Sequence, residues 1–364
     1  MSLEAGHDRP RQILKKLTPV KNYAAAQLMQ FATVFAVPRD CEREVARAIK
    51  INWVLTAAII AFVLMWTGFS DFHLNRAKTA ILIGMLTVVG IGCYLVRTRL
   101  RLQTLPALIE AMAQFPGVSL FIVLMTYQFG SVGAPWADRW LAAPDQFVGF
   151  DWVATNWYVA HHEWLARLLR LCYGAIVWQP PFVIILLAFR MSHRRLAQFM
   201  LAWTLSLTMT SVVFVFAPAK SAYIYYGTNY ALLPELSKAV GQGQFEVLET
   251  LRSGGLRFLL DQDIAGLVTF PSFHCTAAVL FAWALWSTRC LRWPGVIVNV
   301  LMITATPIIG AHYLVDLVAG LAVAIIAIRL AGRWMDAPSQ GTWHDCLSRI
   351  TTAVKSKLGM AKRL

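Results

Sequence analysis

Long hydrophobic runs without charge recur along the chain and are separated by shorter polar segments. A helix that spans a bilayer needs about 20 apolar residues, whereas a transmembrane β-barrel shows short segments of alternating polarity. The pattern therefore predicts an all-α, polytopic membrane helix bundle with about eight transmembrane helices and a six-helix catalytic core. The runs assigned to these helices are 51–69, 79–96, 117–130, 171–189, 197–217, the run after Ser272, 295–310 and 314–328.

The surroundings of these runs predict four parts. Residues 1–50 form a basic N-terminal segment that we expect in the cytoplasm, and its stretch 23–37 fits an amphipathic helix on the membrane surface. Residues 51–97 form an additional transmembrane hairpin. Residues 105–332 form the membrane-embedded core, and 333–364 form a cytoplasmic C-terminal tail.

One segment between runs, residues 131–170, is rich in tryptophan. Such side chains favour the membrane–water interface, so an aromatic belt explains them. A second interpretation is a surface helix that guards a lateral entrance for lipid. The five residues are Trp136, Trp140, Trp152, Trp157 and Trp164.

Composition supports a membrane protein. The chain is 58% hydrophobic and only 14% charged, far less charged than a soluble domain. Its formal net charge of +14 would also suit nucleic acid. However, the basic residues fall at every second boundary between runs, with Arg76 and Lys78 as the exception, and the positive-inside rule explains this spacing. We therefore expect membrane lipids and no nucleic acid as partners, and both termini in the cytoplasm of a bacterium whose inner membrane holds the protein.

The candidate chemistry lies at the start of two runs. "FPSFHC" (270–275) places Ser272 and His274 at the start of the sixth helix, and "GAHYLVDLVAG" (310–320) returns His312 and Asp316 to the same outer side. Ionisable residues in membrane runs are costly and usually mark function. The spacing of four residues puts His312 and Asp316 on one helix face, where a carboxylate fixes the tautomer of a histidine and strengthens its other nitrogen.

The serine also has a structural interpretation. A proline followed by a serine is a good helix start, because the serine side chain can accept a bond from a free backbone N–H. A helix N-terminus attracts phosphate in addition. Ser272 would then be only a cap and His274 only a polar interface residue, or both would belong to a phosphate site.

These two motifs resemble those of the type 2 phosphatidic acid phosphatase superfamily, over about residues 150–330. Its enzymes attack a phosphate with a histidine and form a phosphohistidine without a metal. The resemblance implies that His312 is the nucleophile, that Asp316 orients it, and that His274 protonates the leaving alcohol and then activates the acceptor. It also implies that Ser272 and nearby backbone amides hold phosphate oxygens.

The chain departs from the usual pattern of that superfamily. Many members carry Ser-Arg where Ala305 and Thr306 stand here, and a lysine followed after six residues by Arg-Pro, which this chain lacks. A phosphate needs charge neutralisation, so another cation is expected to replace them. Lys220 is the best candidate, although a lysine at a helix end can also extend its charge to the interface. Arg252 and Arg257 are weaker candidates for this cation. Two interpretations stay open for Tyr223, Tyr225 and Tyr226, which either line the site or belong to the aromatic belt.

The arginine-free second motif and "APAKSAY" (217–223) resemble the inositol phosphorylceramide synthase branch, an inositolphosphotransferase, and its bacterial relatives. In that branch a lipid alcohol accepts the phospho-headgroup instead of water. Four functions therefore remain open: a lipid-phosphate phosphatase on the extracytoplasmic face, a phosphotransferase, a transporter whose histidine and aspartate carry protons, and an inactive relative.

No cofactor or metal is expected. The six cysteines are scattered without a CxxC pair, so neither a zinc site nor a disulfide framework is predicted. Asp316 is the only acidic residue in the core of the predicted site. The sequence also contains no phosphate-binding P-loop and no dinucleotide fingerprint.

Overall fold

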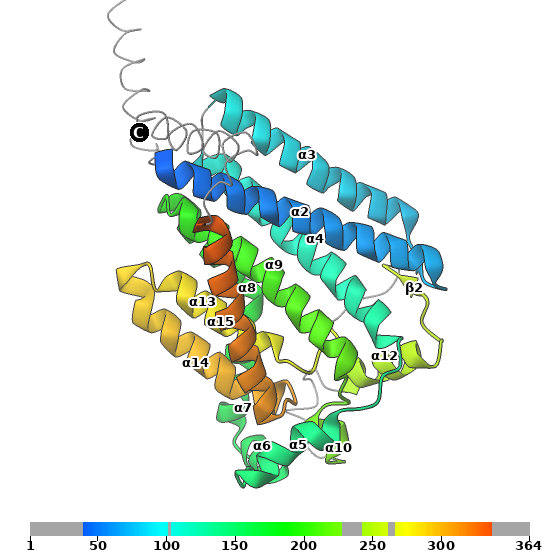
Figure 1. Ribbon diagram of the computed structural model, residues 1–364. Coiled ribbons are helices and arrows are strands. Elements are labelled where there is room, and N and C mark those ends of the chain that lie inside the picture. Colours follow the sequence, from blue (N-terminus) through cyan, green and yellow to red (C-terminus); the bar gives the residue numbers. More distant parts are fainter. Residues whose placement is uncertain (1–38, 101–102, 228–241, 261–265, 337–364) are drawn as a thin grey trace, which may run out of the picture.

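The computed structural model of the protein describes residues 39–100, 103–227, 242–260 and 266–336 (Figure 1). The stretch 23–37 and the C-terminal tail from residue 337 onwards lie outside these ranges, so the surface helix and the tail stay predictions.

Within the described residues the chain folds into a bundle of long helices, and this confirms the predicted all-α membrane architecture (Figure 1). Seven helices are long and apolar enough to cross a membrane. They are α2 (Arg39–Phe69), α3 (Arg76–Leu100), α4 (Thr104–Gly130), the pair α7 (Glu163–Tyr173) and α8 (Ala175–Phe189), α9 (His193–Phe216), α14 (Arg292–Ile309) and α15 (Leu314–Asp336). The remaining predicted helix is α13 (Phe273–Leu285), an apolar helix of 13 residues.

Shorter elements join the long helices. The helices α5 (Asp138–Phe147), α6 (Trp152–Ala160), α10 (Ala222–Tyr225) and α12 (Gln242–Arg252) follow α4 or α9. The strands β1 (His73–Leu74) and β2 (Phe258–Leu259) pair in parallel over two residues each, and the 3₁₀ turn η2 (Arg289–Leu291) precedes α14.

The helix α9 lies at the centre of the bundle and packs against α2, α4, α13 and α15. A helix that is apolar all round is buried, and α9 has buried residues along most of its length. Trp203 is its central anchor, because its ring contacts those of Phe115, Phe199, Phe273 and Phe281 and its indole N–H donates to Ser119 Oγ.

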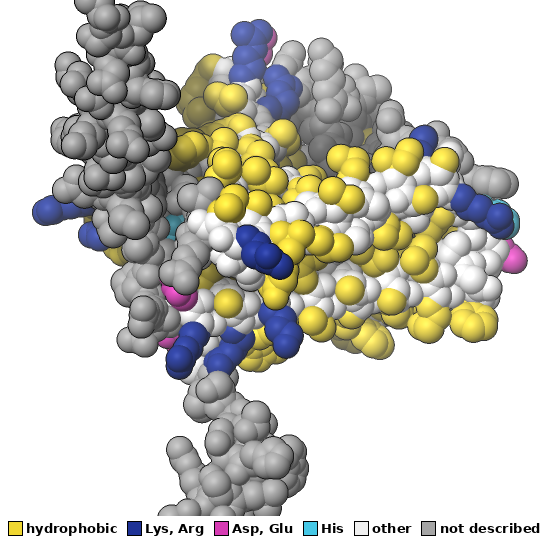
Figure 2. All heavy atoms as spheres, turned by 90° about the horizontal axis from the view of Figure 1, so that it is seen from above, with side chains coloured by type: hydrophobic (Ala, Val, Ile, Leu, Met, Phe, Trp, Pro, Cys, Tyr) yellow, Lys and Arg dark blue, Asp and Glu magenta, His cyan; other side chains and the backbone are white. Residues whose placement is uncertain are grey.

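The hairpin of α2 and α3 is attached at the edge of the bundle. The buried residues of α3 are Thr79, Leu86 and Cys93, one in every seven, so a narrow seam joins this helix to its neighbours. Large apolar side chains cover its other faces, among them Ile81, Met85 and Val88. Figure 2 views this side of the molecule and shows hydrophobic side chains over much of it, with lysines and arginines in small groups.

One end of the bundle contains contacts made by arginines, and the other end contains the candidate site. Arg194 at the start of α9 pairs with Asp336 at the end of α15, and Arg47 of α2 donates to the carbonyl of Met335. Leu314 lies at the other end of α15. With 23 residues, this helix is about 34 Å long at 1.5 Å per residue. The candidate residues before Leu314 therefore lie far from the end at which α2 begins.

The helices α13 and α15 approach each other closely at Gly320. A Cβ atom there would lie 2.5 Å from the carbonyl oxygen of Ser272 and 3.1 Å from Cys275 Cβ. Thr276 Oγ1 donates to the carbonyl of Gly320 across the same contact, at 2.9 Å. The absence of a side chain at residue 320 thus sets the distance between the two helices that carry the candidate site.

We expect Gly320→Ala to lower the stability of the protein by about 1–3 kcal/mol, because the added methyl group must push α13 and α15 apart. Thermal unfolding of the purified protein in detergent measures this as a lower Tm. Gly84→Ala on α3 is the matched control, since a Cβ there meets nothing within 4 Å. Equal Tm values for the two variants would contradict the close approach.

Candidate active site

A buried histidine–carboxylate pair forms the centre of the site. His312 Nδ1 lies 3.0 Å from Asp316 Oδ2, and the backbone N–H of Tyr313 donates to the same oxygen at 3.1 Å. His312 is 4% exposed and Asp316 is fully buried. A histidine whose Nδ1–H donates to a carboxylate leaves Nε2 unprotonated, with its lone pair available for attack. The structure therefore confirms the predicted proximity of these two residues.

Ser272 lies on the other side of the same imidazole. Its Oγ is 3.5 Å from His312 Nε2 and also accepts the N–H of Cys275 at 3.4 Å, so it caps α13 as predicted. Its backbone N–H donates to the carbonyl of Asp316 at 3.1 Å. The start of α13 and the start of α15 are thus held together, and Nε2 of His312 faces a helix N-terminus.

His274 is joined to the pair through an aromatic ring. It stacks on Tyr173 with ring centroids 3.8 Å apart and an interplanar angle of 12°. A Cβ at Gly310 would lie 2.8 Å from Tyr173 Oη and 2.8 Å from His312 Cδ2, so Tyr173 and His312 flank the same glycine. Tyr173 is therefore a neighbour of both histidines, and no motif in the sequence pointed to it.

Two carboxylates of α5 brace the loop that carries His312. Asp138 accepts the hydroxyl of Tyr313 at 2.8 Å and the backbone N–H of Lys220 at 2.9 Å. Burial raises the pKa of the Tyr313 hydroxyl far above its usual value, and the Asp138 charge raises it further, so this hydroxyl stays a donor. The loop after α9 and the loop before α15 are thereby tied to one side chain.

The second brace is Asp145, whose Oδ1 accepts the N–H of Leu314 at 3.0 Å at the start of α15. Burial raises the pKa of this carboxyl to about 6; the Leu314 bond lowers it and the Asp316 charge raises it. Asp138 and Asp145 are seven residues apart, and both are buried. The sequence signal for these residues is a pair of acids two turns apart on the inner face of a helix, within the tryptophan-rich segment.

The predicted cation Lys220 is close to the site through its backbone only. Its Nζ lies over the rings of Trp136 at 5.4 Å and Phe245 at 5.8 Å. Arg252 covers the ring of Trp136 at 3.8 Å and donates to the carbonyl of Ala134. Arg257 extends over Phe72. Contact of any of these three with phosphate stays a prediction.

Another cationic side chain, that of Arg170, belongs to α7, the helix that carries Tyr173. Arg170 lies one turn before Tyr173 on α7, on the stripe that also includes the buried Ala166. Its Nη1 is inaccessible to solvent. Because Arg170 is on the same helix as the ring that stacks on His274, one turn away, we add it to the candidate cations.

Aromatic rings form a wall next to His312. Tyr226 stacks on Trp152 at 5.9 Å, and both Tyr225 and Tyr226 contact the ring of Tyr313 at 6.2 and 6.4 Å. Tyr223, the third predicted tyrosine, is buried in the same cluster. Trp152 is buried and donates to the carbonyl of Pro307 at 2.9 Å. Of the other predicted belt residues, Trp140, Trp157 and Trp164 are exposed.

The described residues contain no group of three histidine, cysteine, aspartate or glutamate side chains able to hold a metal ion. The site instead offers an oriented imidazole, a second imidazole and a helix N-terminus. These groups are of the kinds that can attack a phosphate ester and bind its oxygens.

The chain belongs to the PAP2 superfamily, whose family model matches residues 139–330, more than half of the chain. This confirms the superfamily that the motifs indicated and fits a membrane phosphatase. No curated protein and no solved structure gives a significant match. The match begins at the second residue of α5, so it includes Asp145, both histidines and Asp316 but excludes the α2–α3 hairpin.

The buried carboxyl of Asp145 predicts a pH effect on stability. Its pKa rises from 3.8 to about 6 on folding, so the folded protein binds this proton more tightly than the unfolded chain does. The stabilising contribution is present below pH 4 and is lost as the pH rises through about 6. We expect Asp145→Asn, which cannot ionise, to reduce the fall in Tm between pH 4 and pH 7.

Thermal unfolding in detergent at several pH values measures this slope. Glu163→Gln, which changes an exposed carboxylate of α7, is the control and should keep the slope of the unmodified protein. An Asp145→Asn protein with an unchanged slope would show that this carboxyl does not carry the effect.

Proposed function

We propose that the protein is a lipid-phosphate phosphatase that acts through a phosphohistidine, without a metal, on the extracytoplasmic face of the membrane. The observation that carries the proposal is the geometry of His312: Nδ1 is held by Asp316 at 3.0 Å, and Nε2 faces Ser272 at 3.5 Å at the start of α13. Membership of the PAP2 superfamily and the apolar helices support it.

In the first step His312 Nε2 attacks phosphorus, and the ester P–O bond breaks. His274 begins this step as an imidazolium; it gives its extra proton to the leaving alkoxide, which departs as an alcohol, and becomes a neutral imidazole. Asp316 stabilises the positive charge that develops on the ring of His312, because its carboxylate holds the Nδ1 proton. The hydroxyl of Ser272 and the first N–H groups of α13 bind the phosphate oxygens.

In the second step His274 accepts a proton from water, and the resulting hydroxide attacks the phosphorus. The P–N bond breaks, inorganic phosphate leaves, and His312 returns to its neutral form. The stacking of His274 on Tyr173 holds the ring of this acid–base residue in one plane during both steps.

The missing arginine of the usual motif needs a replacement, and Arg170 is the residue that we place there. Its helix supplies the ring against His274, and a guanidinium can bind two phosphate oxygens at once. Lys220 remains a second candidate, but its ammonium would have to leave the ring of Trp136 to reach a phosphate.

A second candidate function is transfer of the phosphoryl-bearing headgroup to a lipid alcohol. The observation that favours it is the aromatic wall of Trp152, Tyr225, Tyr226 and Tyr313 beside His312. Apolar rings next to the phosphohistidine would disfavour water and accommodate an organic acceptor. The same two histidines would then act, and only the molecule attacking the intermediate would change.

The test measures products from phosphatidic acid and from a polyprenyl phosphate in detergent with a chelator. We expect release of free phosphate and a labelled phosphohistidine, and a loss of activity of about 1,000-fold or more in His312→Ala, because removal of a nucleophile abolishes the covalent step. His161→Ala, an exposed histidine at the same end, is the control.

The same reactions are repeated with a phosphoinositide as donor and with ceramide or diacylglycerol as acceptor. A new phospholipid without free phosphate would replace the phosphatase with the transferase. If a correctly folded protein forms neither product, this result would contradict both enzyme hypotheses and favour the transporter.

The proposed phosphate contact of Arg170 can be tested by comparing its substitution with that of Arg167 on the same helix. We expect Arg170→Gln to raise KM or lower kcat so that kcat/KM falls by about 10-fold or more, because a charge-assisted hydrogen bond to phosphate is worth about 1.5–3 kcal/mol. Arg167→Gln is the control, because that guanidinium is exposed and pairs with Glu163. An equal kcat/KM for both variants would remove Arg170 from the site.

A further inference from the structure

Two adjoining cavities lie along the α2–α3 hairpin, and the first of them is at the end of the bundle opposite to His312. Of the described residues that line the two, His193 alone falls within the segment that matches the superfamily. They are formed by the hairpin of α2 and α3 together with the starts of α4 and α9. The catalytic mechanism uses none of these residues, so the cavities call for a separate explanation.

The first cavity has a volume of about 540 Å³ and a mixed lining of polar and apolar side chains. Its charged and polar side chains gather where α3 ends and where α4 and α9 begin. They are Glu42, Lys50, Arg97, Thr98, Gln103, Glu110 and His193. Both Arg97 and the indole N–H of Trp53 bind the carboxylate of Glu110. Arginine has five N–H donors, so this pairing leaves donors of Arg97 for a second acceptor.

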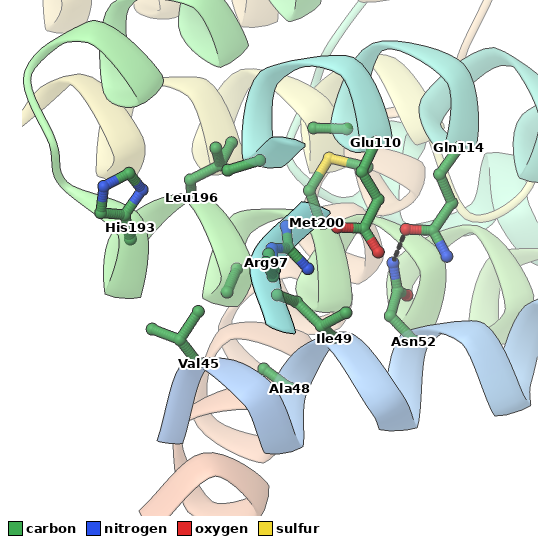
Figure 3. A pocket seen from close by; sticks show the side chains of 13 residues that line it. Val45, Ala48, Ile49, Asn52, Arg97, Glu110, Gln114, His193, Leu196 and Met200 are labelled. Carbon is green, nitrogen blue, oxygen red and sulfur yellow. Dashed lines mark hydrogen bonds and ion pairs between the residues drawn. The ribbon is translucent and has the colours of Figure 1, made fainter. Parts of the chain in front are cut away.

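A smaller cavity of about 30 Å³ continues from the first one between α2, α4 and α9 (Figure 3). Asn52 donates to Gln114 there at 2.8 Å (Figure 3). Asn52 and His193 are 2% and 4% exposed, and Asn52 Oδ1 and His193 Nδ1 have no hydrogen-bond partner among the described residues. Buried polar atoms of this kind are rare, so this small cavity is suited to a polar group that would satisfy them.

The second cavity has a volume of about 590 Å³ and is apolar. It runs between α2 and α3 along Ile60, Leu64, Ile83 and Ile91. Both large cavities are lined by Trp53, Gly90 and Tyr94, so they adjoin at that level of the hairpin. Together they form one elongated space with polar groups at one end and aliphatic side chains along the rest.

We propose that this space binds a glycerophospholipid, with its phosphate at Lys50 and Arg97 and one acyl chain between α2 and α3. The order of polar and apolar lining matches the order of groups along such a lipid. A water-soluble ligand would leave the apolar half unfilled. A lipid without a phosphate would leave Lys50 and the remaining N–H donors of Arg97 unused. The site is separate from catalysis and does not depend on the proposed function.

Gly90 gives the proposal a sharp test. A Cβ there would lie 3.1 Å from the indole of Trp53, at the junction of the two cavities, whereas one at Gly84 on the same helix meets nothing within 4 Å. We therefore expect Gly90→Leu to close the path of the acyl chain and Gly84→Leu to leave it open.

The experiment uses the full chain in vesicles of phosphatidylethanolamine with a small fraction of phosphatidylglycerol carrying a photoactivatable diazirine in one acyl chain. After illumination, mass spectrometry maps the labelled peptides. We expect labelling within 53–64 and 83–94, reduced at least 10-fold in Gly90→Leu and unchanged in Gly84→Leu. Tm values of both variants confirm that they fold.

A diacylglycerol with the same diazirine chain tests the headgroup. We expect it to label the hairpin at least 10-fold less than the phosphatidylglycerol probe, and we expect Lys50→Gln to reduce labelling by the phosphatidylglycerol probe alone. Equal labelling by both probes would overturn the phosphate contact. Labelling of the hairpin that Gly90→Leu leaves unchanged would show ordinary contact with bulk lipid and overturn the site.

Discussion

The candidate site depends on the hydrogen bonds that Asp316 accepts. One oxygen accepts both the Nδ1–H of His312 and the N–H of Tyr313, and the backbone carbonyl of the same residue accepts the N–H of Ser272. A single residue therefore fixes the tautomer of the imidazole, the shape of the loop before α15 and the position of α13. A buried charge is costly unless it is paired, so each of these bonds also stabilises the others.

Elements outside the membrane-spanning helices complete this arrangement. Asp138 and Asp145 connect α5 to the loop of His312, and the absence of side-chain atoms at Gly310 and Gly320 lets Tyr173 and α13 come close. The long helices thus bring the two motifs to one end, while short polar contacts set the final distances. Through this division of roles, two side chains of the short helix α5 help to position the candidate site on another helix.

Hydrophobic runs predicted the class of fold and each of the long helices, because burial in lipid demands apolar length. The helix starts were less predictable: α2 begins at Arg39 and α4 at Thr104, well before their apolar runs, since charged or proline-containing turns carry no such signal. The pair His312 and Asp316 could be predicted because a spacing of four residues brings two side chains together on one turn of a helix. The bond of Tyr313 to Asp138 joins residues 175 positions apart, and the direction of the Lys220 side chain depends on tertiary packing, so neither followed from local spacing.

The narrow seam of α3 has an evolutionary consequence. Outside Thr79, Leu86, Cys93 and the cavity lining, most of its side chains face outward and need only be apolar. Exchanges among leucine, isoleucine and valine there disturb little packing, whereas one exchange at residue 316 breaks several bonds at once. Relatives of this chain should therefore have accumulated substitutions quickly along the outer faces of the hairpin and slowly at the start of α15. Both segments are apolar in sequence, and they differ in the number of specific contacts that their side chains make.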